Sequence, residues 1–359
     1  METALDYLKA LIAFDTRNGT GDEIACVDWL SEVLSGFKPD HLVTETVPRS
    51  RGKSDSAFVL ARWGRPETLL NVHIDTVPSG EGWTADPLDM VVKNEKAFGL
   101  GTSDIKGAAA AILGGLNAVK PQNVAVLLSG DEEHGSEVMP AVIERGHLAG
   151  VKRAIVCEPT SCRVGRAHRG MLALSASFTG HGGHSSLADT LEAPLLKAAR
   201  YAAQVGDYKE AHLDFGMEPF KGLCVNIGEL RSDGAYNVVP TTASAWVSMR
   251  PPPGDDVAKR ESDLRSMAEA YGATPDTIVA MQPFASHHVE EFLSVFSEDE
   301  VVDLPYWTEA ALIGGAGVNT IVYGPGNLEQ AHRPDEYVEL SQLHAAQSRY
   351  ETVLSGALS

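Results

Sequence analysis

The sequence predicts an α/β domain with a mostly parallel sheet, interrupted by an inserted ferredoxin-like α+β domain. Residues 1–169 alternate helical patterns with short apolar runs, as helices and strands do around a parallel sheet. Residues 170–284 follow a different order, and the first pattern returns over residues 285–359. Because an insertion explains this return better than three consecutive domains, we expect the first and last segments to share one sheet.

The first segment shows both helical and strand patterns. Apolar residues recur at helical spacing over residues 5–12 and 24–34. Four apolar runs that end in polar residues are typical of buried strands: 56–63, 68–75, 123–133 and 153–160. Between the second and third runs, a segment rich in alanine and glycine (107–119) predicts a smooth helix that can pack against a sheet.

The middle segment predicts the order β-α-β-β-α-β, which is the ferredoxin-like arrangement. The strands are expected at 171–180, 223–232, 243–250 and 276–282, and the helices at 190–205 and 255–271. In the last segment we expect a helix at 290–299, a strand at 319–323 and a closing helix at 343–358.

The composition excludes several classes of partner and location. The chain has 49 acidic and 29 basic residues, for a formal net charge of −20, and so repels nucleic acid and anionic membranes. The longest stretch of small apolar residues, 107–116, is too short to span a membrane, and the N-terminus lacks the apolar core of a signal peptide. Four cysteines are too few for a disulfide framework. We therefore expect a cytoplasmic protein.

Ionisable residues gather at or just after the ends of the predicted strands. They are His73, Asp75, Asp131, Glu132, Glu133, Glu158 and His332, with Asp104 in the turn before the 107–119 helix. In an open α/β sheet, ligands bind beyond the carboxyl ends of the strands. These side chains can therefore converge although they are far apart in the sequence.

A convergence of carboxylates and two imidazoles predicts a site for two divalent metals. Without cations the carboxylates would repel one another, and some would be forced to protonate. Imidazole and carboxylate ligands suit Zn²⁺, with Co²⁺ as a substitute. Taken singly, the groups have ordinary explanations: a buried histidine with a turn-capping Asp75, and a solvated acidic loop at 131–133. Only their shared position at the strand ends favours the metal site.

The order of short motifs over nearly the whole chain resembles the di-zinc aminoacylase and carboxypeptidase family, and most closely its acetylornithine deacetylase branch. The motifs are HIDTVP (73–78), GLGTSDIKG (99–107), SGDEEHGS (129–136), CEPT (157–160), RAHRG (166–170), GHSS (183–186), RPPPG (250–254), YWTEA (306–310) and GPGNLEQAHRPDEY (324–337). The resemblance implies a zinc-bearing α/β domain, residues 1–169 and 285–359. It also implies that the insert, residues 170–284, is a lid domain through which the chain forms a homodimer.

The resemblance also implies a role for each residue of the site. One Zn²⁺ would be held by His73, Asp104 and Glu158, and the other by Asp104, Glu133 and His332, with Asp104 bridging. Glu132 would be the general base, which must stay free to take a proton from the attacking water. Asp75 would steady its neighbouring ligand His73. A lid histidine of the other subunit would stabilise the oxyanion; His184 matches that motif, with His181 as the alternative.

The implied substrate is an N-acetyl-L-amino acid of arginine biosynthesis, either N-acetylornithine or N-acetylcitrulline, with ornithine slightly favoured by its frequency in the family. Arg250 would bind the α-carboxylate, because the planar guanidinium of an arginine can pair with both oxygens. Asn237 would assist it. Glu309 is the candidate for the distal group of the substrate. The alternatives are a succinyl-diaminopimelate desuccinylase, a dipeptidase, or a binding homologue without metal or activity.

Overall fold

The computed structural model describes residues 2–19, 21–50, 54–296 and 301–358, which form two compact units. The first unit comprises Met1–Arg166, Ser286–Leu304 and Thr308–Ser359, and the second comprises Ala167–Ala285 and Pro305–Trp307. The sequence does not predict that Pro305–Trp307 group with the second unit. The main segment of the second unit, Ala167–Ala285, is thus inserted in the sequence between two parts of the first.

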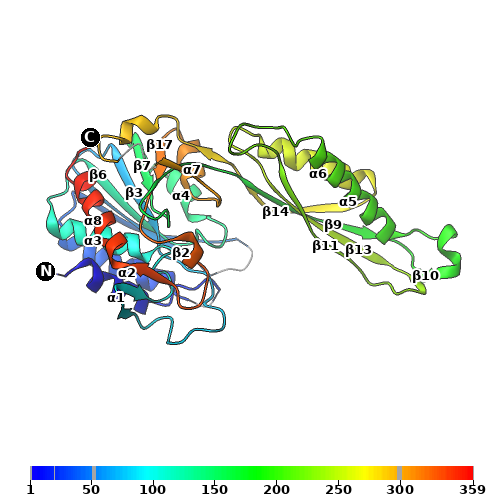
Figure 1. The fold of residues 1–359 in the computed structure, drawn as a ribbon, viewed down its shortest axis with the longest axis horizontal. Helices are drawn as coiled ribbons and strands as arrows, with labels where there is room; N and C mark the ends of the chain where they lie inside the picture. The colour runs from blue at the N-terminus through cyan, green and yellow to red at the C-terminus, as the bar shows by residue number, and fades with distance from the viewer. Residues whose placement is uncertain (1, 20, 51–53, 297–300, 359) are drawn as a thin grey trace. The chain divides into compact units, whose positions relative to one another are not determined.

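The first unit is built on a mixed sheet whose central strands are parallel (Figure 1). The strands follow the order β1 (His41–Val47), β2 (Ser56–Trp63), β6 (Val124–Ser129), β3 (Thr68–His73), β7 (Arg153–Val156), β17 (Asn319–Val322) and β8 (Val164–His168). The run β6-β3-β7-β17 is parallel, while β1, β2 and β8 pair antiparallel with their neighbours. The predicted α/β class is confirmed, and the first and last segments share the sheet because β7 pairs with β17.

Helices cover both faces of this sheet because its strands are apolar on both sides. The helices that share one apolar core are α1 (Ala4–Ala13), α2 (Glu23–Gly36), α3 (Lys106–Ala118) and α8 (Leu340–Leu354). Leu70 and Val72 of β3 point into that core. Since side chains alternate along a strand, Asn71 and His73 face the other side. The short helices α4 (Val138–Glu144) and α7 (Ala310–Gly315) contact each other and the strands β2 and β17, respectively.

A small antiparallel sheet joins two loops of the first unit that are distant in sequence. Its order is β18 (Tyr337–Glu339), β5 (Lys96–Phe98) and β4 (Val91–Lys93), and Tyr337 pairs with Phe98. The loop after β5 leads into α3, and the loop before β18 follows β17. The pairing therefore brings residues just after 98 beside residues just before 337.

The second unit has the predicted β-α-β-β-α-β order. Its elements are β9 (Met171–Thr179), α5 (Pro194–Glu210), β11 (Cys224–Ser232), β13 (Thr242–Arg250), α6 (Val257–Ala270) and β14 (Thr274–Met281). All pairs are antiparallel in the order β11-β13-β9-β14, and both helices contribute to one apolar core with the same face of the sheet. A separate ribbon pairs β10 (Gly183–His184) with β12 (Val238–Val239).

Some elements differ from the sequence-based expectation. The helix expected at 290–299 is, in its described part, a short 3-10 helix (Val289–Phe292) followed by a turn, and residues 297–299 lie outside the described part of the chain. Strand β1 is not predicted, because this edge strand is half exposed and its polar residues hide the strand pattern. None of the described helices combines the length and apolar character that crossing a lipid bilayer requires.

Candidate metal centre

The strand ends of the first unit bring the predicted metal ligands together. Strand β3 ends at His73, and Glu158 follows β7 by two residues. Asp104 lies in the loop just before α3, and Glu133 lies in the loop after β6. His332 follows β17 and has a backbone φ of 60°. Five segments that are remote in sequence therefore contribute one side chain each.

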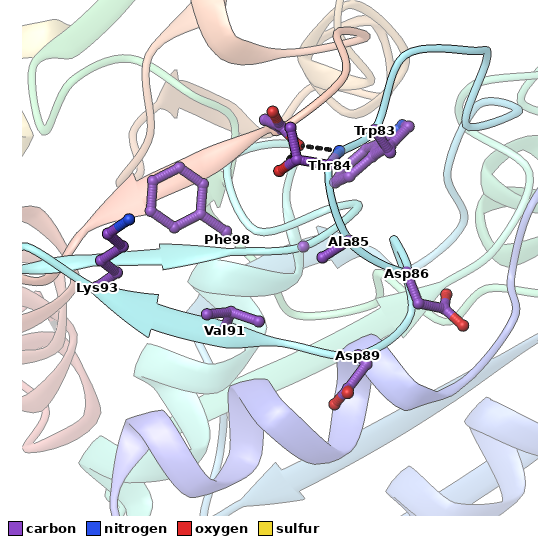
Figure 2. Close-up of a pocket in the computed structure, with 10 residues that line it drawn as sticks. Trp83, Thr84, Ala85, Asp86, Asp89, Val91, Lys93 and Phe98 are labelled. Carbon is purple, nitrogen blue, oxygen red and sulfur yellow. Dashed lines mark hydrogen bonds between the residues drawn. The ribbon is translucent and has the colours of Figure 1, made fainter.

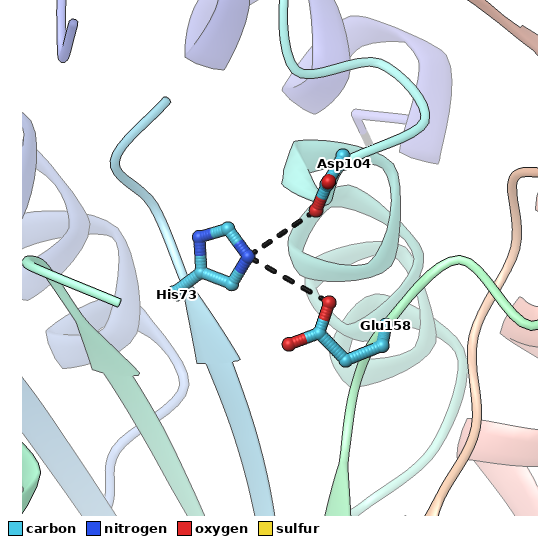
Figure 3. A group of neighbouring side chains, drawn as sticks. All are labelled: His73, Asp104 and Glu158. Carbon is cyan, nitrogen blue, oxygen red and sulfur yellow. Dashed lines mark ion pairs between the residues drawn. The ribbon is translucent and has the colours of Figure 1, made fainter. Parts of the chain in front are cut away.

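The first ligand cluster consists of His73, Asp104 and Glu158 (Figure 3). Nε2 of His73 lies 3.3 Å from Oδ1 of Asp104 and 3.8 Å from Oε2 of Glu158. The two carboxylates approach the same ring nitrogen in Figure 3, so one nitrogen and two oxygens converge on a common point. His73 and Glu158 are buried.

The second ligand cluster consists of Asp104, Glu133 and His332. Nε2 of His332 lies 2.7 Å from Oε1 of Glu133 and 3.3 Å from Oδ2 of Asp104. Asp104 thus directs Oδ1 to the first cluster and Oδ2 to the second. A carboxylate shared in this way is the usual bridge between the two ions of a hydrolytic site.

The donor atoms fit divalent cations. Oε1 of Glu158 is buried and has no hydrogen-bond partner among the described residues, which is costly for a carboxylate oxygen unless a cation binds it. Burial raises the pKa of Glu158 to about 8, and hydrogen bonds to Asp104 and Glu133 raise the pKa of His332 to about 10. Burial alone would lower the pKa of His73, but Asp104 and other carboxylates raise it well above its ordinary value. The centre therefore favours positive charge between its carboxylates.

Glu132 belongs to neither ligand cluster although it stands next to Glu133. Burial and the negative charge of Glu158 raise the pKa of Glu132 well above its ordinary value. The charge of His73 lowers this pKa, and those of Glu133 and Glu309 raise it further. A carboxyl group with a raised pKa beside the ligands can both take and return a proton near neutral pH.

Asp75 fixes the backbone of the loop that carries Glu132 and Glu133. Its Oδ1 accepts a hydrogen bond from the N–H of Glu132 at 3.1 Å, and its Oδ2 accepts one from the N–H of Glu133 at 3.0 Å. Asn18 Nδ2 donates a third, at 3.0 Å. Nδ1 of His73 lies 3.4 Å from Oδ1 of Asp75, so the same carboxylate also orients a candidate ligand. Asp75 lies two residues beyond the end of β3.

Asp131 fixes the start of the same loop, with a backbone φ of 73°. Its Oδ1 accepts a hydrogen bond from Nη1 of Arg49 at 2.8 Å, and its Oδ2 accepts one from the N–H of Glu137 at 2.7 Å. The side chain is buried. The ordinary explanation of a solvated acidic loop is therefore wrong for Asp131.

Glu309 lies inside the first unit, directly before α7, and is completely buried. Its Oε2 accepts a hydrogen bond from Nδ2 of Asn71 at 2.9 Å, and its Oε1 accepts one from Oγ of Ser136 at 2.7 Å. Burial raises its pKa. Both oxygens are thus engaged within the protein, and neither is exposed for direct contact with a substrate.

The other three predicted site residues lie in the second unit. His184 is exposed in β10, and its Nδ1 lies 2.8 Å from Oγ of Ser186. Asn237 is exposed, and its carbonyl accepts a hydrogen bond from the N–H of Ser185 at 3.1 Å. Arg250 is the last residue of β13 and is half-buried. Their part in the site stays a prediction, and the alternative histidine, His181, is exposed as well.

Sequence reasoning missed several polar residues that support the centre. Asn18 donates a hydrogen bond to Asp75, and Asn71 donates one to Glu309. The buried Glu336 binds the loop that carries Asp104. Each acts on a residue far away in sequence, so no local spacing predicts the contact. The available signal for Glu336 is its place in the motif at 324–337, four residues after His332.

A separate pocket of about 330 Å³ lies over the small sheet of the first unit (Figure 2). Trp83, Val91 and Phe98 line it with apolar surface, and its edge includes Asp335, whose Oδ1 accepts a hydrogen bond from the N–H of Thr84 at 2.9 Å. None of the metal-centre side chains is among its described lining residues. This pocket is therefore not the metal centre.

Comparisons with known proteins agree with this geometry. The family model of Peptidase family M20/M25/M40 matches residues 69–355. The N-acetyl-L-citrulline deacetylase of Xanthomonas campestris is 32% identical over 374 residues, covering 99% of this chain and 99% of that protein. The acetylornithine deacetylase of Pasteurella multocida is 31% identical over 350 residues, covering 90% of this chain and 87% of that protein.

Solved structures share the fold at low sequence identity. An M20 family metallo-carboxypeptidase from Sulfolobus solfataricus has a TM-score of 0.76 at 16% identity, with 99% of each chain covered. A dinuclear metal-binding peptidase of the M20 family from Bacillus subtilis has a TM-score of 0.67 at 13% identity, covering 99% of this chain and 97% of that chain. At these identities the likeness concerns the fold alone.

Proposed function

The chain belongs to peptidase family M20/M25/M40, and we propose that it is a zinc-dependent amidohydrolase that removes acetate from an N-acetyl-L-amino acid of arginine biosynthesis. The observation that carries the proposal is Asp104, which faces His73 with one oxygen and His332 with the other while Glu132 remains outside both clusters. A protein that only bound its ligand would have no use for a free carboxyl group beside two ligand sets. Two relatives with deacetylase names support the reaction.

Each of the two ligand clusters would hold one metal ion. His73, Asp104 and Glu158 would hold one Zn²⁺, and Asp104, Glu133 and His332 the other, with Co²⁺ able to substitute. Bound there, the ions would polarise the amide carbonyl and acidify the attacking water. All ligands apart from His332 are buried or nearly so, which strengthens electrostatic effects inside the centre.

Glu132 transfers the proton in this proposal. Its carboxylate takes a proton from the water whose oxygen attacks the carbonyl carbon of the acetyl group. The protonated Glu132 then gives that proton to the amide nitrogen as the carbon–nitrogen bond breaks. The products are acetate and the free amino acid, and Glu132 returns to its starting state. The hydrogen bonds from the 132–133 backbone to Asp75 hold Glu132 in place for both transfers.

The second unit would act as a lid and as the dimer interface. Arg250 would bind the α-carboxylate of the substrate through its planar guanidinium, assisted by Asn237. His184 of the partner subunit would donate a hydrogen bond to the oxyanion of the tetrahedral intermediate. The exposure of His184 supports this role, since its ring is available to a second chain. A cytoplasmic location belongs to the same proposal, because the substrates are intermediates of amino-acid biosynthesis.

The side chain of the substrate is better matched by a ureido group than by an ammonium group. An ammonium group in a partly desolvated pocket needs an anionic partner. Glu309, the candidate for that partner, is completely buried and engaged by Asn71 and Ser136. A neutral ureido group needs hydrogen bonds alone, and the relative with 32% identity is named for citrulline. We therefore favour N-acetyl-L-citrulline over N-acetyl-L-ornithine.

Acetate release across a panel of acyl amino acids tests the proposal. We expect kcat/KM to be highest for N-acetyl-L-citrulline, followed by N-acetyl-L-ornithine, and to fall at least about tenfold when the α-carboxylate is replaced by an amide, since a hydrogen bond to a charged group contributes about 1.5–3 kcal/mol. Arg250→Lys should reduce this preference for the free acid. A preference for N-succinyl-diaminopimelate or for dipeptides would overturn the substrate class. Metal-bound protein without activity on any of them would favour the binding homologue.

A further inference from the structure

Glu336 joins two of the three loops that carry the ligands of the second cluster, those of Asp104 and His332. It lies four residues after His332, and its side chain reaches the loop at 99–104 that ends in Asp104. The residue is 1% exposed. The two loops are separated by more than 220 residues in sequence, so this contact sets their spacing in the folded protein.

The carboxylate of Glu336 accepts three hydrogen bonds from backbone N–H groups of one turn. Its Oε1 accepts from Ser103 at 2.7 Å and from Asp104 at 3.0 Å, and its Oε2 accepts from Gly101 at 3.0 Å. The main-chain oxygen of Glu336 accepts a fourth, from the N–H of Gly99 at 3.0 Å. Backbone N–H groups that point at one carboxylate leave the turn little freedom, because buried donors are costly to leave unpaired.

A carboxylate suits this position better than an amide. A glutamine has one oxygen and one NH₂ group, and both oxygens of Glu336 are acceptors. Whichever way a glutamine turned, its NH₂ group would face at least one N–H donor, so one or two hydrogen bonds would be lost. In one orientation the turn that ends in Asp104 would lose its contact at Gly101, and in the other it would lose the contacts at Ser103 and Asp104.

We propose that Glu336 is a positioning residue that holds Asp104 opposite His332 and thereby sets the affinity of the second ligand cluster for a divalent cation. The inference rests on the proposed metal centre and deepens it. The first cluster depends less on Glu336, since His73 and Glu158 are fixed by β3 and β7 rather than by the 99–104 loop. Loss of Glu336 should therefore weaken the second site more than the first.

The test compares metal binding by wild type, Glu336→Gln and Glu336→Asp, measured as Zn²⁺ and Co²⁺ titrations against a competing chelator. We expect Glu336→Gln to bind the weaker of its two ions about 10–100-fold less tightly, the usual effect of losing a group that orients a ligand. Glu336→Asp keeps both oxygens but is one methylene shorter, so we expect a smaller loss. Asp255→Asn is the matched control, because Asp255 is a buried carboxylate of the second unit that binds Arg260.

A thermal measurement separates positioning from general stabilisation. A purely structural role would lower Tm equally with and without Zn²⁺, as expected for Asp255→Asn. A positioning role also reduces the rise in Tm on adding Zn²⁺, because affinity lost 10–100-fold removes about 1.4–2.7 kcal/mol of binding stabilisation. A folded Glu336→Gln protein with two sites of wild-type affinity would overturn the inference. Wild type that fails to bind two ions would instead overturn the proposed centre.

If neither Glu336→Gln nor Glu336→Asp folds, hydrogen exchange in the wild-type protein tests the role of Glu336. The amides of Gly101, Ser103 and Asp104 should be protected already in metal-free protein, because Glu336 and not the cation orders the turn. Protection that develops only when Zn²⁺ or Co²⁺ is added would contradict the inference.

Discussion

The backbone N–H of Glu132 donates a hydrogen bond to Oδ1 of Asp75, with 3.1 Å between the two atoms. The neighbouring N–H of Glu133 donates to the other oxygen of the same carboxylate. One side chain thus orients both the proposed general base and a proposed metal ligand. Because Asp75 also lies beside Nδ1 of His73, it connects the two ligand clusters through the protein.

Asp75→Asn should lower kcat by about 10–100-fold with a small change in KM. The amide NH₂ would face one of the two backbone N–H donors, so the loop of Glu132 would shift while the proposed substrate-binding residues of the second unit stay unchanged. Steady-state kinetics with N-acetyl-L-citrulline measure the effect. Asp255→Asn is the control, because Asp255 pairs with Arg260 within the second unit. An unchanged kcat in Asp75→Asn would contradict this role.

Glu132→Gln should retain both metal ions but lose at least about 10²-fold in kcat, the usual scale for a missing general base. Glu133→Gln should lose metal at the second site as well as activity, because Glu133 contacts His332. Metal content per chain and kcat are measured on the same preparations. If Glu132→Gln loses metal while Glu133→Gln keeps metal and activity, the two roles are reversed.

Removal of metal by a chelator should abolish acetate release, and Zn²⁺ or Co²⁺ should restore it. The physical reason is the convergence of carboxylates, which positive charge must offset. The measurement is activity of dialysed protein before and after titration with each ion, with Ca²⁺ as a control because it prefers more oxygen ligands. Acetate release by protein shown to be metal-free would contradict the assignment of two catalytic metal ions.

Metal-free protein should become less stable as pH rises from 5 to 9. Glu158 has its pKa raised from 4.5 to about 8 by burial, so it favours the folded state below pH 4.5 and loses this contribution as pH rises through 8. His332, raised from 6.5 to about 10 by Asp104 and Glu133, acts in the same direction between those values. Calorimetry should show Tm falling by at least about 2 °C, given about 2–4 °C per kcal/mol for a unit of this size.

Zn²⁺-loaded protein is the comparison for this pH series. Its Tm should fall less between pH 5 and 9, because the cations offset the carboxylate charge. Glu158→Gln should flatten the metal-free profile by removing one titrating group. A metal-free Tm that rises over this range would contradict the prediction.

His184→Ala should lower kcat with little effect on KM, since an oxyanion donor acts mainly in the transition state. If the histidine acts on the partner's centre, mixing His184→Ala with Glu132→Gln protein should regenerate activity, because one of the two centres in the mixed dimer has both groups intact. Affinity tags on each variant would verify the mixed dimers. No recovery in verified mixed dimers would contradict action in trans.

The parts of the fold that could be predicted are those with strong local periodicity. The run at 56–63 predicts β2 to the residue, and the runs at 68–75 and 123–133 predict β3 and β6 with their polar ends. The convergence of the ionisable side chains was predicted as well, since carboxyl ends of parallel strands share one edge of a sheet, whereas their division into two ligand sets came from the family resemblance. Edge strand β1 was not predicted. Most of its residues are exposed or half-buried, so its sequence does not need an apolar pattern.

The supporting residues could not be predicted, because their partners are set by tertiary structure. Glu336 binds backbone N–H groups, and those groups carry no sequence signal. Glu309 was predicted to bind the substrate from its motif, but burial between Asn71 and Ser136 gives it partners inside the protein. The motif identifies Glu309 as a residue of interest, but the tertiary packing determines which groups its side chain contacts.

The pairing of β7 with β17 has a consequence for the order in which the protein is made. Thr320 lies opposite Ala154, although the whole second unit separates these residues in the chain. A ribosome therefore delivers the second unit, which has its own core, before the strand that covers the open edge of β7. His332 is the last of the proposed ligands to be synthesised. A nascent chain halted before residue 319 would present an unpaired strand edge, which invites aggregation, and would lack the second ligand set.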